Sequence, residues 1–372
     1  MKKGRLSMDP SYQGIPTPAV WINLDTAYRN ITKMVQENEK YGIAHRPHIK
    51  VHKSSFLAKK QIELGAKGIT CAKISEAEVM VNAGITDILI AYPLIGQDKW
   101  DRFAELSRRA DLITIVNSTV GAEGLSKVGE RLGKPVRVLI EVDGGINRGG
   151  LKPGQPVLEF AEAIRHLKGL DICGVMYYGG AIYGQKTLEG IRTLVKREHD
   201  DLVGNRDLLV KNGFKIDILS GGSSFSSKQP DLLEGITEVR AGNYIFNDCA
   251  QLPIGLVTEG DCALRVISTV VCRPDEHTAI IDAGSKTLTS DLAHFRSGYG
   301  YIVGHPDIEI YQLNEEHGFL RYDKPIPFEI GEKIAIIPNH ACVVTNINEN
   351  VYGVSGGKVV RKIDIDARAK NY

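Results

Sequence analysis

The sequence predicts an α/β protein that consists of a (β/α)8 barrel of the TIM type and a C-terminal, mostly-β domain. Between residues 25 and 250, eight short apolar runs alternate with longer amphipathic segments, which is typical of repeated βα units. The span is close to the ~250 residues usual for such a barrel. After residue 250 the long helical periods stop, and short alternating segments with Gly and Asp turns follow. We therefore assign residues 25–250 to the barrel and 251–372 to the β domain, and leave open whether residues 1–24 contribute to the latter.

Each predicted barrel strand is an apolar run bounded by turn residues or by a helix-like segment. Several of the helix-like segments end in glycine, a common helix stop. The predicted strands are RPHIKVH (46–52), GITCAKI (68–74), DILIAYP (87–93), LITIVNS (112–118), VRVLIEVD (136–143), DICGVMYY (171–178), IDILSGG (216–222) and TEVRAGNYIF (237–246). Helices are predicted within 54–65, 75–84, 155–169 and 191–213, and the β domain is predicted from segments 262–274, 277–288, 328–348 and 350–365.

The composition favours a soluble globular protein with a small neutral or anionic substrate. The chain of 372 residues is 42% hydrophobic and 24% charged, and its formal net charge is +1, so no overall field attracts nucleic acid or an anionic membrane. It contains no apolar run of the ~18–20 residues needed to cross a bilayer, and we expect a cytoplasmic location. The six cysteines are scattered without a C-x-x-C pair, which predicts reduced and mostly buried thiols.

Basic residues alternate along the first predicted strand. In an extended strand, Arg46, His48, Lys50 and His52 share one face, and in a barrel this face points inward near the carboxyl end of the strand. A lysine whose pKa is lowered by neighbouring cations is a nucleophilic amine that can form a Schiff base with a carbonyl. We therefore predict a chemical role for Lys50, and we interpret Lys53 as part of a solvated basic edge.

Two glycine-containing turns follow the seventh and eighth predicted strands. They are SGGSS (220–224) and RAGNY (240–244), and they lie where barrels usually hold a phosphate group. A glycine pair alone most often marks an ordinary turn. Arg148, after the fifth strand, carries a planar fork suited to an anionic oxygen, and a salt bridge at the barrel rim is the alternative.

These motifs, together with the order in which they occur, resemble the fold type III pyridoxal phosphate (PLP) enzymes, which share an alanine racemase-like N-terminal barrel. The segments RPHIKVHKS, EVDGGINRGGL, SGGSS and EVRAGNYIFND are most similar to the D-serine dehydratase and D-threonine aldolase branch, from about residue 16 onward. The resemblance implies that Lys50 carries pyridoxal 5'-phosphate. It also implies cofactor contacts from Arg148, Tyr178, Gly222, Ser223, Arg240, Gly242, Asn243 and Tyr244.

The resemblance gives some of these residues narrower roles. It places Arg148 near the phenolic oxygen of the cofactor or the substrate carboxylate, and it places Arg240 opposite the pyridine nitrogen. Tyr178 occupies a position where many relatives carry histidine, so the side chain of the substrate stays undefined. His52 is a candidate proton carrier, with a supporting structural role as an equal alternative.

A candidate metal motif lies in IIPNHACVV, where His340 and Cys342 are two residues apart. In an extended segment both side chains leave the same face, although a buried cysteine beside a structural histidine is the more common explanation. The segment resembles a P-N-H-x-C element of the family, which implies two ligands for a divalent metal. Imidazole and thiolate favour Zn²⁺, and Mn²⁺ or Mg²⁺ remain open. Segment 280–291 resembles another element of the family's β domain, without a catalytic role for Lys286.

The resemblance implies a PLP- and metal-dependent lyase that acts on a D-3-hydroxy amino acid. Cys342 favours D-serine dehydratase-type elimination to a 2-oxo acid and ammonia, because the aldolase branch is expected to carry aspartate there. D-threonine aldolase-type cleavage to glycine and an aldehyde is the main alternative, followed by an amino-acid racemase and by a non-enzymatic PLP carrier. The family also implies a homodimer in which each β domain covers the partner's barrel mouth.

Overall fold

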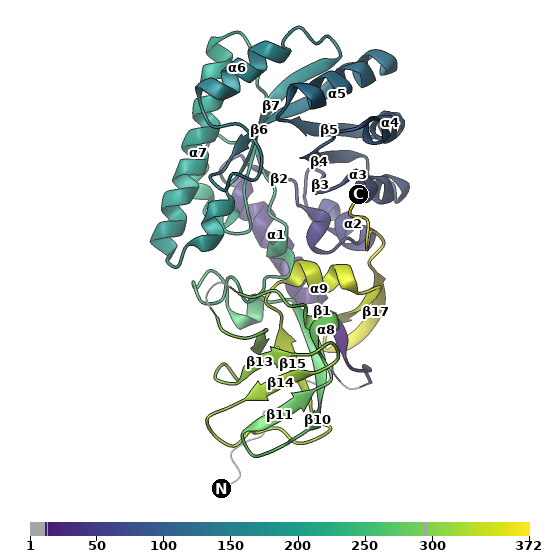
Figure 1. The fold of residues 1–372 in the computed structure, drawn as a ribbon, viewed down its shortest axis with the longest axis vertical. Helices are drawn as coiled ribbons and strands as arrows, with labels where there is room; N and C mark the ends of the chain where they lie inside the picture. Colours follow the sequence, from purple (N-terminus) through teal and green to yellow (C-terminus); the bar gives the residue numbers. More distant parts are fainter. Residues whose placement is uncertain (1–11, 13, 294–295) are drawn as a thin grey trace. The chain divides into compact units, whose positions relative to one another are not determined.

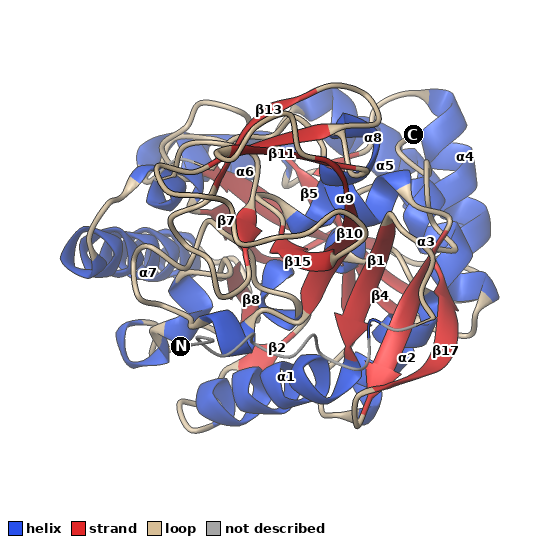
Figure 2. Cartoon of the chain, turned by 90° about the horizontal axis from the view of Figure 1, so that it is seen from below, coloured by secondary structure: helices blue, strands red, loops and turns tan. Residues whose placement is uncertain are grey.

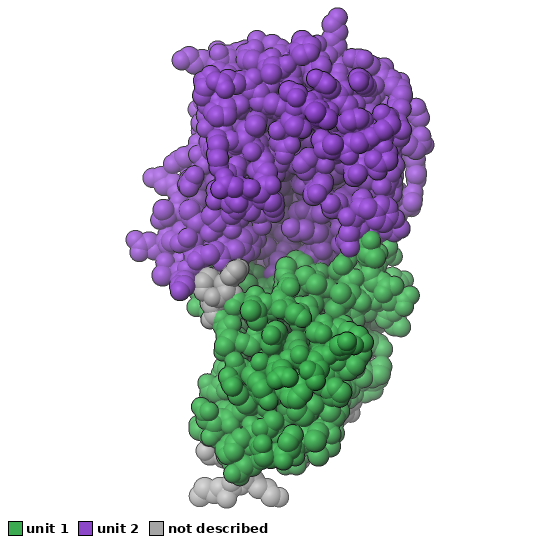
Figure 3. Space-filling view, viewed as in Figure 1, with its two compact units in different colours: residues 1–30, 245–369 green, residues 31–244, 370–372 purple. Residues whose placement is uncertain are grey.

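The computed structural model describes residues 12, 14–293 and 296–372 and divides the chain into two compact units (Figures 1 and 3). The barrel unit comprises Ile31–Tyr244 and Lys370–Tyr372, and the β unit comprises Met1–Asn30 and Ile245–Ala369. Both units are therefore discontinuous in sequence.

The barrel unit is built on eight parallel strands. They are β2 (Ala44–His45), β3 (Ile69–Cys71), β4 (Asp87–Pro93), β5 (Asp111–Val116), β6 (Val136–Asp143), β7 (Leu170–Tyr178), β8 (Ile218–Gly221) and β9 (Glu238–Val239), in the order β2-β9-β8-β7-β6-β5-β4-β3. The N–H of Lys67 donates to the carbonyl of His45 at 2.9 Å, and the N–H of Thr70 donates to the carbonyl of Pro47 at 2.8 Å. A parallel bridge between His48 and Thr70 adds to these bonds. The first strand thus joins β3, the sheet closes on itself, and the predicted barrel is confirmed.

Helices cover the outer face of this sheet (Figures 1 and 2). The helices are α1 (Leu24–Glu39), α2 (Ser55–Glu63), α3 (Ile74–Asn82), α4 (Gln97–Leu106), α5 (Thr119–Leu132), α6 (Gln155–Ile164) and α7 (Leu188–Lys211). The hydroxyl of Ser118 caps the start of α5 by accepting from Gly121, and Gly133 ends it with φ +68°. Apolar side chains from neighbouring strands, including Leu89, Ile113 and Leu139, form a core cluster of the barrel.

The prediction for the first strand, residues 46–52, is wrong. Only Ala44–His45 is strand, and Ile49–Val51 forms a 3-10 turn, η2, which the N–H of His52 closes on the carbonyl of Ile49. Pro47 cannot donate a ladder hydrogen bond, and four basic side chains on one inward face would be costly to bury. The basic side chains consequently do not share a face. The eighth strand is also shorter than predicted, because Asn243–Ile245 forms another 3-10 turn, η6.

Arg46 is part of a buried ion pair instead of the predicted basic face. Its Nε donates to Glu238 at 3.0 Å, its Nη1 pairs with Asp87, and the Arg46 and Glu238 side chains are 2% and 1% exposed. Asp87 and Glu238 are the first residues of β4 and β9, so Arg46 points toward the amino ends of these strands. Burial alone would raise the pKa of Glu238, but Arg46 outweighs it and holds that pKa below its usual range. The stabilisation from the Arg46–Glu238 pair is therefore fully present at a pH above the unfolded-state pKa of Glu238. It is lost as the pH falls through the lower folded-state pKa of Glu238.

We expect Arg46→Met to lower the free energy of unfolding by about 3–5 kcal/mol, because it removes the closest cation from the buried Glu238 carboxylate. Urea denaturation at neutral pH measures the change. Lys40→Met is the matched control, since Lys40 pairs with Glu37 at the surface with 61% of its side chain exposed, and such pairs contribute about 0–1 kcal/mol. Equal midpoints for the two variants would contradict the prediction.

Lys53, predicted to be solvated, is buried. Its backbone is left-handed with φ +47°, and its amine pairs with Glu76 at 3.3 Å and donates to Asn371 at 2.5 Å. The hydroxyl of Ser75 donates to the carbonyl of Tyr372 at 2.6 Å. These bonds explain why Lys370–Tyr372 belongs to the barrel unit.

The described residues of the β unit form a nine-stranded sheet and two short helices, so the mostly-β prediction is confirmed. The strands are β1 (Ala19–Asn23), β10 (Leu264–Cys272), β11 (Thr278–Ile281), β12 (Tyr301–Ile302), β13 (Glu309–Leu313), β14 (Gly318–Arg321), β15 (Lys333–Ile337), β16 (Asn350–Ser355) and β17 (Lys358–Asp364), and the helices are α8 (Ser285–Leu288) and α9 (Ala341–Ile347). Strand β1 lies between β10, with which it is antiparallel, and β16, with which it is parallel.

All six cysteines are free, and four of them are buried, as expected; Cys272 is exposed and Cys342 is half-buried. In the described part of the chain, every helix is too short or too polar to cross a membrane.

Candidate active site

The carboxyl ends of six barrel strands bring together the residues of the candidate site. Since the strands are parallel, these ends meet at one edge, where barrel enzymes place their sites. We call this edge the mouth and define it by Lys50 on η2, Asn117 after β5, Glu141 and Arg148 on and after β6, Tyr178 at the end of β7, Gly222 after β8 and Arg240 after β9.

Lys50 presents its amine at the mouth. The neighbouring Ile49 and Val51 are fully buried and fix η2, whereas Lys50 is exposed and forms no hydrogen bond or ion pair with another described residue. His48 begins this turn, and its Nδ1 is buried without a partner in the described structure. Burial, followed by the positive charges of Lys50 and Arg240, holds the pKa of His48 well below its usual value. A neutral imidazole with an open nitrogen thus lies near the Lys50 amine.

Glu141 is the acidic member of the mouth. It is 6% exposed and accepts from the side-chain amide of Asn117 at 2.7 Å. Burial raises the pKa of Glu141, and the Asn117 bond and the charges of Arg148 and Arg240 oppose this effect. The guanidinium of Arg148 lies 4.3 Å from the centroid of the Tyr178 ring, a cation–π arrangement that leaves Arg148 exposed.

Asp143 shapes the loop that carries Arg148. One of its oxygens accepts from the backbone N–H groups of Gly145 and Asn147, both at 3.1 Å, and the other accepts from Lys152 at 2.5 Å. Burial alone would raise the pKa of Asp143, but these bonds lower it. Arg148 therefore extends from an ordered loop.

His52 lies in a buried hydrogen-bond chain below the turn. Its Nδ1 accepts from the N–H of Ser54 at 3.1 Å, so its Nε2 carries the proton and donates to Gln61 at 3.0 Å. Gln61 in turn donates to the Tyr244 hydroxyl at 2.9 Å, and Tyr244 packs edge-on against His45. His52 is fully buried with both ring nitrogens engaged, which favours the supporting role over that of a proton carrier.

The turn after β8 uses some of its donors internally. The N–H of Gly222 donates to Glu198 at 2.6 Å, and the N–H of Ser223 donates to the Ser226 hydroxyl at 2.7 Å. The buried N–H groups of Ser224 and Gly242 have no acceptor among the described residues. A Cβ on Gly242 would lie 2.8 Å from the carbonyl of His48, so only glycine fits between η2 and the turn after β9. Asn243 follows directly, on η6.

Arg240 is the buried member of the mouth and is held by hydrogen bonds. It is 5% exposed, and it donates to the Ser220 hydroxyl and to the Tyr177 carbonyl, both at 2.8 Å. Burial lowers the pKa of Arg240, although Glu238 and Glu198 offset part of the cost.

The mouth fits a cofactor with an aldehyde and a phosphate group. The exposed Lys50 amine suits an aldehyde, while the buried N–H groups of Ser224 and Gly242 suit phosphate oxygens. The open Nδ1 of His48 and the arginines Arg148 and Arg240 provide further polar contacts for a ring and its anionic substituents.

His340 and Cys342 form a separate pair in the β unit. Cys342 lies in α9 and His340 is the residue before this helix, so the predicted extended geometry is wrong, although the two side chains are within hydrogen-bonding reach of each other. The Nδ1 of His340 bonds Asp291 at 2.6 Å, and the N–H of Ala341 donates to Asp248 at 3.1 Å. Burial opposes protonation, but Cys342, Asp248 and Asp291 together raise the pKa of His340 to about 10.

This donor set fits a metal with few protein ligands. Among residues 12, 14–293 and 296–372, no three His, Cys, Asp or Glu side chains form a metal cluster. Asp291 engages Nδ1 of His340 and leaves Nε2 for a metal, as carboxylates often do behind metal-bound histidines. Imidazole nitrogen and thiolate sulfur suit Zn²⁺, and the remaining positions would belong to water or substrate.

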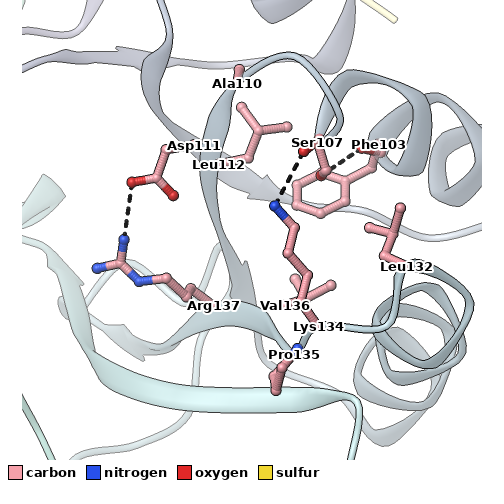
Figure 4. A pocket seen from close by; sticks show the side chains of 10 residues that line it. All are labelled: Phe103, Ser107, Ala110, Asp111, Leu112, Leu132, Lys134, Pro135, Val136 and Arg137. Atoms are coloured by element: carbon pink, nitrogen blue, oxygen red, sulfur yellow. Dashed lines mark hydrogen bonds and ion pairs between the residues drawn. The ribbon is translucent and has the colours of Figure 1, made fainter.

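A small pocket lies at the opposite edge of the barrel sheet (Figure 4). Its lining includes Asp111 and Val136, the first residues of β5 and β6. Its charged groups are already paired, because Arg137 bonds Asp111 and Lys134 donates to the Ser107 carbonyl, both at 3.3 Å. It contains no residue of the mouth, and we do not assign a function to it.

Several residues of these sites were not identified from the sequence. Asp291 is 49 positions from His340 and Glu198 is 24 positions from Gly222, so no local pattern indicates either contact. Glu141 lies in a strand that reads as core. His48 was placed on the basic face, but no role was assigned to it.

Comparison with known proteins gives two family matches. Residues 22–249 match the model described as alanine racemase, N-terminal domain, and residues 263–354 match the putative serine dehydratase domain. The D-threo-3-hydroxyaspartate dehydratase of Delftia sp. (strain HT23) is 33% identical, over 88% of this chain and 91% of that protein.

Two solved structures extend the comparison. The D-threonine aldolase of Filomicrobium marinum is 30% identical in sequence with a TM-score of 0.89. The alignment covers 96% of this chain and 97% of the aldolase chain. A cysteine-to-alanine variant of D-threo-3-hydroxyaspartate dehydratase in the metal-free form is 31% identical with a TM-score of 0.87, covering 94% and 97% of the two chains.

Proposed function

Because this chain belongs to the family that joins an alanine racemase-type N-terminal domain to a serine dehydratase-type domain, we propose that it is a PLP- and divalent-metal-dependent lyase of a D-3-hydroxy amino acid. The preferred reaction is elimination to a 2-oxo acid and ammonia. The observation that supports the proposal is the exposed Lys50 amine, which has no partner in the described part of the chain and lies beside the open nitrogen of His48 at a cationic mouth.

The residues of the chain take distinct parts in this reaction. PLP held at Lys50 would supply an electron sink for the substrate Cα, and a divalent metal held by His340 and Cys342 would supply a Lewis acid for the β-hydroxyl. Lys50 holds the cofactor and then accepts the α-proton at Nζ. Arg148 binds the substrate carboxylate or the cofactor's phenolic oxygen, and Tyr178 orients Arg148 through its ring.

Cleavage to glycine and an aldehyde is the second candidate. It uses the same residues, and its support is the similarity to the D-threonine aldolase of Filomicrobium marinum. Cys342 favours the dehydratase reaction, because the aldolase branch is expected to carry aspartate at this position. A racemase or a PLP carrier would leave the His340–Cys342 pair and Asp291 without a role. We further expect a homodimer, which light scattering on the purified protein tests.

Product analysis separates these reactions. Incubation with D-serine, D-threonine and 3-hydroxy-D-aspartate is expected to release ammonia and a 2-oxo acid in equal amounts from at least one of them, with little glycine. The L-enantiomers are the matched controls and should stay unchanged. Glycine as the main product would contradict elimination and favour the aldolase reaction. Interconversion of enantiomers would favour a racemase, and no turnover would favour a PLP carrier.

A further inference from the structure

Glu198 is a buried carboxyl group with no part in the proposed reaction. It lies on α7, is 1% exposed and accepts the N–H of Gly222 at 2.6 Å. Glycines surround it, since a Cβ on Gly221 would lie 2.9 Å and one on Gly179 would lie 3.2 Å from its oxygens. The chain therefore leaves room for this carboxyl group directly beside the turn after β8.

Glu198 and Ser226 together determine the shape of this turn. Glu198 hydrogen-bonds the Ser226 hydroxyl, which also accepts the N–H of Ser223 at 2.7 Å. Gly222 has φ +80°, and a Cβ there would lie 2.4 Å from that of Val239. The turn is thus held in a left-handed conformation that only glycine adopts easily.

The shape of the turn decides which donors remain for a ligand. With the N–H groups of Gly222 and Ser223 engaged, the N–H of the buried Ser224 is left without an acceptor among the residues that the structure describes, as is the N–H of Gly242 after the next strand. Burial raises the pKa of Glu198, which disfavours its charged form and so lessens its repulsion of an anion bound nearby. A carboxyl group at this point is therefore compatible with a phosphate site.

We propose that Glu198 is a positioning residue for the cofactor phosphate: it fixes the Gly222–Ser224 turn so that the free N–H groups receive the phosphate oxygens. This inference rests on the proposed function, because it requires that the mouth binds PLP.

The test compares affinity for PLP with affinity for pyridoxal, which lacks the phosphate, by absorbance or fluorescence titration of the whole protein. In Glu198→Met, which cannot accept a hydrogen bond, the preference for PLP over pyridoxal is expected to fall at least about tenfold, as for a buried donor left unsatisfied. In Glu198→Gln, which keeps an acceptor, the preference is expected to stay within about threefold of wild type. Glu189→Gln, at an exposed position of α7, is the surface control.

Each outcome of these titrations supports or contradicts the positioning role of Glu198. An unchanged preference in Glu198→Met, or equal losses of PLP and pyridoxal affinity, would overturn the inference in favour of a general structural role. A tenfold loss of preference in Glu198→Gln would also overturn it. If Glu198→Met does not fold, Glu198→Asp replaces it, because its shorter side chain withdraws from Gly222 and is expected to show the same loss. If the wild-type protein binds neither compound, the proposed function itself fails.

Discussion

Lys50→Ala is expected to reduce turnover of the preferred D-3-hydroxy amino acid by about 10³–10⁴-fold, because the variant lacks both the covalent anchor of the cofactor and the base for the α-proton. The wild-type protein with PLP is expected to absorb in the visible range, and the variant is not. Borohydride reduction and peptide mass spectrometry should locate the fixed pyridoxyl group on Lys50.

Lys59→Ala is the matched control, because Lys59 is an exposed lysine nine residues further on in α2. It should retain full turnover and full absorbance. Labelling of another lysine in the wild-type protein, or a Lys50→Ala variant that remains active, would contradict the assignment. Because Lys50 forms no bond with other described residues, a loss of stability is not expected to obscure the result.

Removal of the metal is the second change that we expect to have a large effect on turnover. Treatment with a chelator is expected to lower turnover at least about 10²-fold while the PLP absorbance stays, because the β-hydroxyl then lacks a Lewis acid. Added Zn²⁺ should restore activity. Cys342→Ala and His340→Ala should show the same loss without recovery, and Asp291→Asn should weaken metal affinity by about 10–100-fold by disturbing the His340 ring.

Cys272→Ala provides the control for these variants, since Cys272 is an exposed thiol at the end of β10 in the same unit. Its turnover and metal content should match wild type. Turnover that is indifferent to chelation, with metal content confirmed to be zero, would contradict the metal-dependent lyase and favour a racemase or a carrier.

The sequence predicts the barrel well where burial alone determines the structure. VRVLIEVD and DILIAYP are strands at their predicted bounds, because both segments are rich in the apolar and β-branched residues of strands that are buried on both faces. Segment 46–52 is wrongly predicted to be a strand, because its basic residues alternate with apolar ones as in a half-exposed strand. In the structure, Arg46 is neutralised by two carboxylates more than 40 positions away in sequence, which no local reading can anticipate.

The residues of the candidate sites also differ in whether the local sequence predicts them. Lys50, Gly222 and Gly242 are recognisable from their local segments, since each follows a barrel strand. Glu198 and Asp291 are not, because their partners come from other elements. The α-helical start at Ala341 was missed because ACVVTNI is rich in β-branched residues, which usually favour strands.

The place of β1 between β10 and β16 has a consequence for biosynthesis. Strand β1 leaves the ribosome first, but β10 begins at residue 264, so at ~5–20 residues per second the strand waits tens of seconds for its neighbour. Throughout that interval both of its edges can pair with other chains. The nascent chain should therefore depend on chaperones until translation is nearly complete, and fragments that end before residue 264 should aggregate through their N-terminal segment.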